Sequence, residues 1–261
     1  MTSLQDPRLT SDRALAMTNL VLASAQPAAA YVTRLTGRGV SEAERSRKLS
    51  GPVTPAEGTF AIWLPLFLTS VVHGARIALR PPQDQPLPRT NWLMSAAYSC
   101  NAAWSLQAQL RGLGWTSVSI ILASATTAST ALILAERESE HSPESRNTAN
   151  AVAPLAGWLT LATFANTEAT LNGVFGRPAR REETVRSVAL LLAATLTAGT
   201  IATAARGNRL YTAAVAWGLG GVVLRNVRER KVAVAIAAGL GCAAALAATV
   251  FGGRRSARAA A

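Results

Sequence analysis

The sequence is short of charge. Only 15% of its residues are Asp, Glu, Lys or Arg, while 49% are hydrophobic, and a typical soluble domain is about 25% charged. The charges are also grouped, because long uncharged runs alternate with short segments that contain arginine. This pattern argues against an ordinary soluble protein. It predicts an all-α polytopic membrane protein, a helical bundle of about eight transmembrane helices.

Cysteine and lysine are scarce as well. Cys100 and Cys242 each lie inside an apolar run without ligand spacing to a histidine, so we interpret them as small buried hydrophobic residues. We expect no disulfide and no metal site. The net charge of +12 comes almost entirely from arginine. Because the basic residues lie between apolar segments, we expect membrane lipids rather than nucleic acid as their partners.

Motifs for catalysis and nucleotide binding are absent from the sequence. It contains no Walker loop, no GxGxxG at a strand–helix junction, no HExxH and no GxSxG. We therefore expect a protein that is not an enzyme, with no catalytic residue and no required cofactor.

Eight apolar segments are predicted to span a membrane. They cover residues 14–33, 58–79, 91–110, 114–135, 150–175, 187–205, 210–224 and 232–253. The first could instead be a signal peptide, because residues 28–30 resemble a cleavage site, but the positively charged leading segment is missing. Residues 34–57 and 136–148 are predicted to be loops, the second acidic and in water.

Aromatic and amide side chains recur at helical spacing in three of these segments. Trp63 and Phe67 are four residues apart and share one helix face, although alone they also fit an aromatic belt at the start of a membrane helix. Asn101 and Trp104 are one turn apart, and an amide buried in a membrane requires a partner on a neighbouring helix or a ligand. In the fifth segment four residues recur at intervals of four: Pro154, Trp158, Ala162 and Asn166.

These three segments resemble the second, third and fifth helices of the TspO/MBR family (tryptophan-rich sensory protein or translocator protein, of the peripheral benzodiazepine receptor type). The residues that carry the resemblance are Phe60, Trp63, Phe67, Asn101, Trp104, Ser105, Pro154, Trp158, Ala162, Thr163 and Asn166. The resemblance implies a five-helix core over residues 1–176. Residues 177–261 depart from the five-helix form and are predicted to be an extension of three helices.

The resemblance also implies a ligand, either a tetrapyrrole such as a porphyrin or haem, or a sterol-like lipid. Flat tryptophan faces suit a planar hydrophobic ligand, held among the second, third and fifth helices of a receptor, sensor or carrier. The predicted ligand-binding residues are Trp63, Phe67, Asn101, Trp104, Trp158, Ala162 and Asn166. We expect Trp115 and Trp217 to lie outside the site, and the core to keep some binding without residues 181–261.

An ion-coupled secondary transporter is the alternative function. Its candidate coupling residue is Glu168, an acid inside the fifth segment, where charge is costly and usually functional. Glu168 could equally have a structural role and pair with Arg177 or Arg180 beyond the helix. A third hypothesis, an enzyme that acts on a porphyrin, lacks an acid–base pair. His73 is expected to be a buried, hydrogen-bonded residue rather than a metal ligand.

The distribution of basic residues predicts the orientation. The loops after the first, third, fifth and seventh segments carry 14 basic residues, against 11 on the side of both termini. The positive-inside rule then places the first set in the cytoplasm, at a bacterial cytoplasmic membrane. Small residues four apart in the last three segments, Ala214 with Gly218 and Ala237 with Gly241, predict close helix packing. A homodimer is left open.

Overall fold

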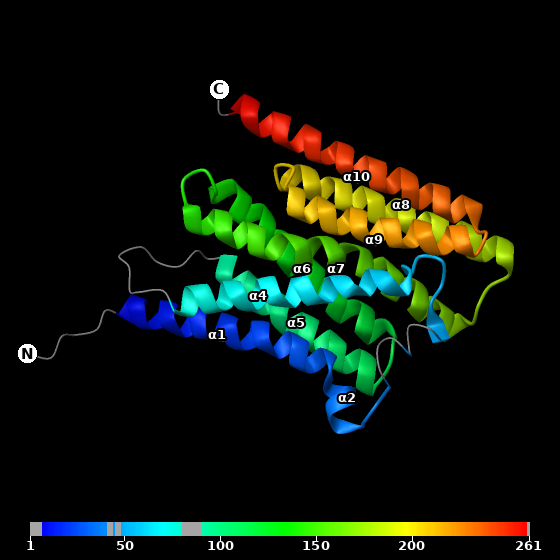
Figure 1. Cartoon of the computed structure of the whole chain (residues 1–261), viewed down its shortest axis with the longest axis horizontal. Coiled ribbons are helices and arrows are strands. Elements are labelled where there is room, and N and C mark those ends of the chain that lie inside the picture. The colour runs from blue at the N-terminus through cyan, green and yellow to red at the C-terminus, as the bar shows by residue number, and fades with distance from the viewer. Residues whose placement is uncertain (1–6, 41–43, 45–47, 80–89, 260–261) are drawn as a thin grey trace, which may run out of the picture.

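Each of the eight predicted segments is helical in the computed structural model, which describes residues 7–40, 44, 48–79 and 90–259 (Figure 1). No strand occurs in these ranges, so the all-α prediction is confirmed for them. The elements are α1 (Pro7–Ala30), α2 (Val32–Thr36), the 3-10 helix η1 (Glu57–Ile62), α4 (Trp63–Ala78), α5 (Thr90–Leu110), α6 (Trp115–Glu138), α7 (Pro143–Phe175), α8 (Arg180–Ala204), α9 (Arg209–Arg228) and α10 (Val232–Ala259).

Helix α7 lies at the centre of the molecule. It packs against α4, α5 and α6 on one side and against α8 and α9 on the other, while α10 packs on α8 and α9. Figure 1 shows α8, α9 and α10 running together along the group formed by α1 and α4–α7. The predicted five-helix and three-helix parts therefore meet along α7.

The helices differ in whether their length and hydropathy suit a membrane span. Within the described ranges, four helical stretches are long and apolar enough to cross a membrane: Glu57–Ala78, Trp115–Glu138, Arg180–Ala204 and Val232–Gly252. The others are more polar because they carry buried side chains such as Asn19, Asn101 and Glu168, which bond to other parts of the fold. The count of eight spans stays a prediction.

Outward-facing leucines, isoleucines and valines line the helices that reach the surface. They include Leu64, Leu68 and Val72 on α4, Leu192 and Leu196 on α8, and Ile236 and Leu240 on α10. On each helix these residues recur three or four positions apart and form an apolar face. Such faces suit contact with lipid tails.

Small residues let the helices approach closely. A Cβ added to Gly157 of α7 would lie 2.4 Å from the carbonyl oxygen of Tyr211 in α9, and one added to Gly241 of α10 would lie 2.4 Å from Thr195 Oγ1 in α8. A Cβ on Gly218 would meet Leu161 at 2.5 Å. The small residues predicted to allow close approach therefore do so at Gly218 and Gly241.

Two predicted loops are shorter or more buried than expected. The segment 136–148 is mostly helical, because α6 continues to Glu138 and α7 begins at Pro143, where the side chain of Ser142 caps the helix by accepting from Ser145 N. Only residues 139–142 connect the two helices, and Ser145 and Thr148 are buried. In the first loop, residues 50–55 are all buried, and we call them the buried loop.

The two cysteines are free thiols, and both are half-buried rather than fully buried. Cys100 lies on α5 and Cys242 on α10. Cys242 Sγ donates a weak hydrogen bond to Ala216 O of α9 at 4.0 Å.

Candidate functional site

A cluster of aromatic rings joins three helices, with Trp63 at its centre. The Trp63 ring stacks on Phe67 of the same helix, with centroids 5.3 Å apart, and on Trp104 of α5 at 6.3 Å. Trp158 of α7 meets Trp63 edge-on at 5.9 Å, and Phe60 meets Trp158 edge-on at 5.7 Å. Both arrangements are favoured geometries for aromatic pairs. The three tryptophans singled out in the sequence thus lie together.

The local chain geometry explains why Trp63 can occupy this position. The 3-10 helix η1 runs directly into α4 at Trp63, whose N–H bonds to Phe60 O and Ala61 O, and Pro65 follows in the first turn of α4. Phe60 and Trp63 are therefore carried by one continuous helical stretch, and both rings reach Trp158.

A cavity of about 1120 Å³ adjoins these rings. Six of the seven predicted ligand-binding residues line it: Trp63, Phe67, Trp104, Trp158, Ala162 and Asn166. The cavity lies toward the end of the bundle where α1 ends, α4 begins, and α7 and α9 end. That end carries the larger number of basic residues.

Asn166 is held by a partner in α6. Its Nδ2 donates to Ser117 Oγ at 3.1 Å, and the serine hydroxyl lies 3.3 Å from Asn166 Oδ1. Both residues are buried. The amide thus lines the cavity with its orientation fixed by a neighbouring helix.

Asn101 lies outside the cavity lining. It is 1% exposed, and its Nδ2 donates to Gln26 Oε1 of α1 at 2.8 Å. The sequence left open whether Asn101 binds a neighbouring helix or a ligand, and in the fold it binds a neighbouring helix. Asn101 therefore joins α5 to α1, and its grouping with the ligand-binding residues is not supported by its position.

Replacing Asn101 by leucine is expected to lower the free energy of unfolding by about 1–2 kcal/mol, because the Gln26 carbonyl oxygen loses its buried donor. Cys100→Ala, at the neighbouring half-buried position, should change stability by less than about 0.5 kcal/mol. Thermal unfolding of both variants in detergent measures the difference. Equal tolerance of the two substitutions would contradict the assigned role.

The three-helix part supplies one wall of the cavity. Leu191 and Ala194 of α8 and Leu219 and Val222 of α9 belong to its lining. Deletion of residues 181–261 would open this wall, and the expectation that the core keeps some binding without them stays a prediction.

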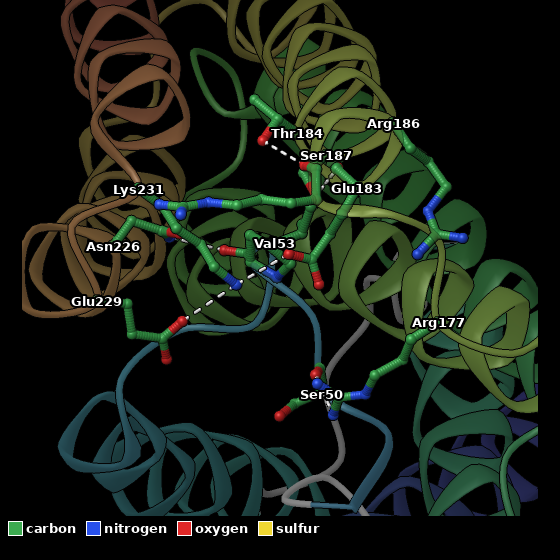
Figure 2. Close-up of polar contacts among 12 residues, drawn as sticks. Ser50, Val53, Arg177, Glu183, Thr184, Arg186, Ser187, Asn226, Glu229 and Lys231 are labelled. Carbon is green, nitrogen blue, oxygen red and sulfur yellow. Dashed lines mark hydrogen bonds and ion pairs between the residues drawn. The ribbon is translucent and has the colours of Figure 1, made fainter.

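The buried loop closes the same end of the cavity and is held mainly by α9. Asn226 Nδ2 donates to Pro52 O at 2.7 Å, and Arg225 Nη1 donates to Thr54 O at 3.3 Å. Figure 2 shows this loop, with Ser50 and Val53, between α7, α8 and α9. Val53 and Thr54 line the cavity. The sequence gives only a weak signal for this arrangement, an uncharged run with two prolines.

Trp217 of α9 also contacts the chain that follows the buried loop. Its Nε1 donates to Thr59 O at 2.8 Å, and the amide of Ala56 donates to Gly221 O at 3.0 Å, so α9 binds the chain just before α4. Trp217 is nevertheless outside the cavity lining, as predicted. Trp115, half-exposed at the start of α6, is outside the cavity lining as predicted.

Glu168 anchors the buried loop from the side of α7. Its side chain is fully buried and accepts from Val53 N at 2.8 Å and from Ser187 Oγ of α8 at 2.6 Å. A Cβ at Gly51 would lie 2.3 Å from Glu168 Oε2, so glycine is needed at that position. The contacts of Glu168 therefore differ from the pairing with Arg177 or Arg180 that the sequence suggested.

Arg177 instead holds the loop itself. Its Nη2 donates to the carbonyl oxygens of Ser50 at 3.1 Å and Lys48 at 3.2 Å (Figure 2). Arg177 lies in the connection between α7 and α8, and it fixes the loop together with Glu168 of α7 and Arg225 of α9.

At the same end of the bundle, ion pairs join α8 to the turn between α9 and α10. Lys231 lies 3.0 Å from Glu183 and 3.3 Å from Glu229, and Glu229 also pairs with Arg225 at 2.8 Å (Figure 2). Burial by itself would raise the pKa of Glu229, but the hydrogen bonds and charges of Arg225 and Lys231 outweigh it, and the pKa is lowered. Glu229 therefore stays ionised at neutral pH.

Metal ligation has no support in the described part of the chain, where no group of three or more His, Cys, Asp or Glu residues could hold an ion. His73 is 4% exposed, hydrogen-bonds with Asn91 and lies outside the cavity lining. The arrangement at the cavity offers stacking surfaces and a few fixed polar groups, the features of a binding site.

The fold and the cavity define an integral membrane protein of the helical type, with an aromatic-lined cavity inside the bundle. A family model described as TSPO-like protein matches residues 15–251. The chain therefore belongs to the TSPO-like family. The match continues beyond residue 176, where the resemblance seen in the sequence ended, through α8, α9 and most of α10. Searches of curated proteins and of solved structures found no match.

Proposed function

We propose that this protein binds a planar hydrophobic ligand, a tetrapyrrole or a sterol-like lipid, as a receptor, sensor or carrier. The observation that carries the proposal is the stacked group of Trp63, Trp104 and Trp158, which come from three helices and line one cavity of about 1120 Å³. Ligand sites commonly have volumes of about 300–1,000 Å³ and apolar, aromatic walls. This cavity is large enough for a ligand with several fused rings.

Two of these tryptophans also offer hydrogen bonds. The Nε1 atoms of Trp104 and Trp158 are buried and have no partner among the described residues. A buried indole N–H usually finds an acceptor, because leaving it unpaired costs about 1–3 kcal/mol. An acceptor on the ligand would supply that bond and fix the orientation of the ring system.

The position of Glu168 favours binding over ion-coupled transport. Its carboxylate bonds to Val53 N and Ser187 Oγ, and Glu168 is outside the cavity lining. These contacts support a structural role. The cavity lies at the arginine-rich end, which the positive-inside rule places in the cytoplasm, and we propose the bacterial cytoplasmic membrane as the location.

Replacing Trp63, Trp104 or Trp158 by alanine is expected to weaken binding of protoporphyrin by about 1–2 kcal/mol each, roughly ten-fold in Kd, through lost apolar contact. Trp115→Phe is the matched control, because Trp115 is 51% exposed and outside the cavity lining. Quenching of tryptophan fluorescence, checked by the shift in porphyrin absorbance, measures the affinity.

A parallel titration with a sterol distinguishes the two ligand classes. Saturable binding of either ligand that depends on the three tryptophans supports the proposal. If Trp115→Phe weakens binding as much as the three alanine variants, the cluster is only a packing feature and the binding site lies elsewhere.

A further inference from the structure

A second group of buried polar side chains lies toward the other end of the bundle from the cavity, where α4 ends and α5 and α7 begin. His73 of α4 is 4% exposed and hydrogen-bonds with Asn91 of α5, which is fully buried. Asn19 of α1 donates from its Nδ2 to Asn91 O at 3.0 Å. We call His73, Asn91 and Asn19 the polar cluster. It joins three helices around one imidazole ring.

The imidazole of His73 has a nitrogen available for a further interaction. Its Nε2 is buried and has no hydrogen-bond partner among the described residues. His73 also lies within the stretch Glu57–Ala78, which is long and apolar enough to cross a membrane. Ionisable side chains are costly in such segments, and in pumps and transporters they form proton relays. Histidine suits this role because its charge changes between about pH 5 and 8.

Glu144 is the acid that faces this ring. It lies half-buried in the first turn of α7, close enough for its charge to act on His73. The other charged group that acts on His73 is Arg76, an exposed residue one turn further along α4. From α1 and α5 the neighbours are the uncharged amides of Asn19 and Asn91. Glu144 is therefore the acid that can exchange a proton with His73.

Two hydroxyl side chains lie between the polar cluster and the cavity. Ser70 lies one turn before His73 on α4, and Phe67, a further turn back, lines the cavity. The fully buried Tyr98 of α5 lies beside Ser70. Phe67 and His73 are six positions apart, which is about 9 Å at 1.5 Å per residue. A positive charge on His73 would therefore lie close to the inner end of the cavity.

We infer that His73 and Glu144 form a proton-binding site that couples the water at this end of the bundle to the ligand cavity. The Glu144 carboxylate takes a proton from the solution and gives it to the imidazole of His73, which becomes a cation while the carboxylate is ionised again. Because the two sites are coupled, protonation changes the ligand affinity, and the ligand changes the proton affinity by the same factor. The inference rests on the proposed function for its ligand. The acid that it uses differs from Glu168, which holds the buried loop.

The protonation of His73 can be followed directly, because the chain has only two histidines. The full-length protein with isotope-labelled histidine is titrated by NMR in phosphatidylcholine nanodiscs between about pH 5 and 8, without ligand. His141, exposed in the connection between α6 and α7, is the internal reference, and His73→Gln assigns the two signals. Both rings should titrate in this range. If the ring of His73 stays neutral throughout, the inference is overturned.

Glu144→Gln tests the pair in the same experiment. At a given pH, the ratio of protonated to neutral His73 should fall about five-fold, because the negative charge that attracts the proton is gone. Glu182→Gln is the matched control, since it removes an exposed carboxylate at the opposite end of the bundle and should leave this ratio unchanged. Identical titration of His73 in the wild-type protein and in Glu144→Gln would show that the two residues do not act as one site.

Protoporphyrin dimethyl ester tests the coupling to the cavity, because it has no carboxylate of its own to titrate. Its affinity for the wild-type protein and for Glu182→Gln should change about three-fold or more between about pH 5.5 and 7.5, and this change should be lost in His73→Gln. The bound ester should also move the titration midpoint of His73. An equal pH effect in the wild-type protein and in His73→Gln would overturn the inference while the proposed function stands. If the ester does not bind at either pH and a sterol does not bind, the proposed function and the coupling fail together.

Discussion

Replacing Glu168 by alanine is expected to lower the free energy of unfolding by about 2–3 kcal/mol, because the amide of Val53 is left buried without an acceptor. The carboxylate is fully buried and connects α7 to the buried loop and to Ser187 of α8. Glu168→Gln keeps an acceptor oxygen for Val53 and should cost less than about 1 kcal/mol. Chemical or thermal unfolding of the purified variants measures these changes.

The control for this prediction is Glu182→Ala, which removes an exposed carboxylate from α8 and should change stability by less than about 0.5 kcal/mol. Equal stability of Glu168→Ala and Glu182→Ala would show that the loop is not held as described. The pair Glu168→Gln and Glu168→Ala also separates the two roles considered for this acid. In an ion-coupled transporter, Glu168→Gln would stop transport while leaving the protein stable.

Replacing Gly157 by alanine is expected to cost about 3 kcal/mol, at the upper end of the range for overpacking. The added Cβ would lie 2.4 Å from the carbonyl oxygen of Tyr211 and 3.0 Å from the Cβ of Ala214. Because the nearest atom belongs to the backbone of α9, the clash is relieved only if the two helices move apart. That movement would also displace the wall of the cavity that α9 provides.

Gly199→Ala is the matched control in the neighbouring helix α8, where an added Cβ meets nothing within 4 Å. It should leave the protein unchanged or stabilise it by up to about 1 kcal/mol, since alanine favours the helix over glycine. Unfolding in detergent and porphyrin affinity are measured for both variants. If Gly157→Ala is as stable as Gly199→Ala, α7 and α9 do not make the close contact described.

Several features of the site could be predicted because they depend on local spacing. Trp63 and Phe67 are one helical turn apart, so the helix itself brings their rings together at 5.3 Å. The stripe formed by Trp158, Ala162 and Asn166 likewise follows from a period of four residues, and all three line the cavity. The resemblance to a family added the order of the helices, and with it the expectation that Trp104 lies near Trp63.

Other features could not be predicted because their partners are far apart in the sequence. Asn101 required a partner, but only helix packing shows that Gln26 supplies it rather than a ligand. For Glu168 the sequence offers Arg177 and Arg180 as possible partners because they are close along the chain, whereas Val53, to which it bonds, is 115 residues away. Trp217 and Thr59 are separated by 158 residues. No spacing rule predicts contacts of this kind.

The class of this protein, its helices and the residues of its aromatic face follow from the sequence, because hydropathy and the helical period are properties of short segments. Helix packing places the buried loop between α7, α8 and α9, and it brings Leu219, Arg225 and Arg228 into the same cavity as Trp63. This packing depends on close contacts between helices. Gly157, Gly218 and Gly221 bring α9 into contact with α7 and with the chain before α4. The sequence shows that these residues are small, but the helix that each of them contacts depends on the packing of the whole bundle.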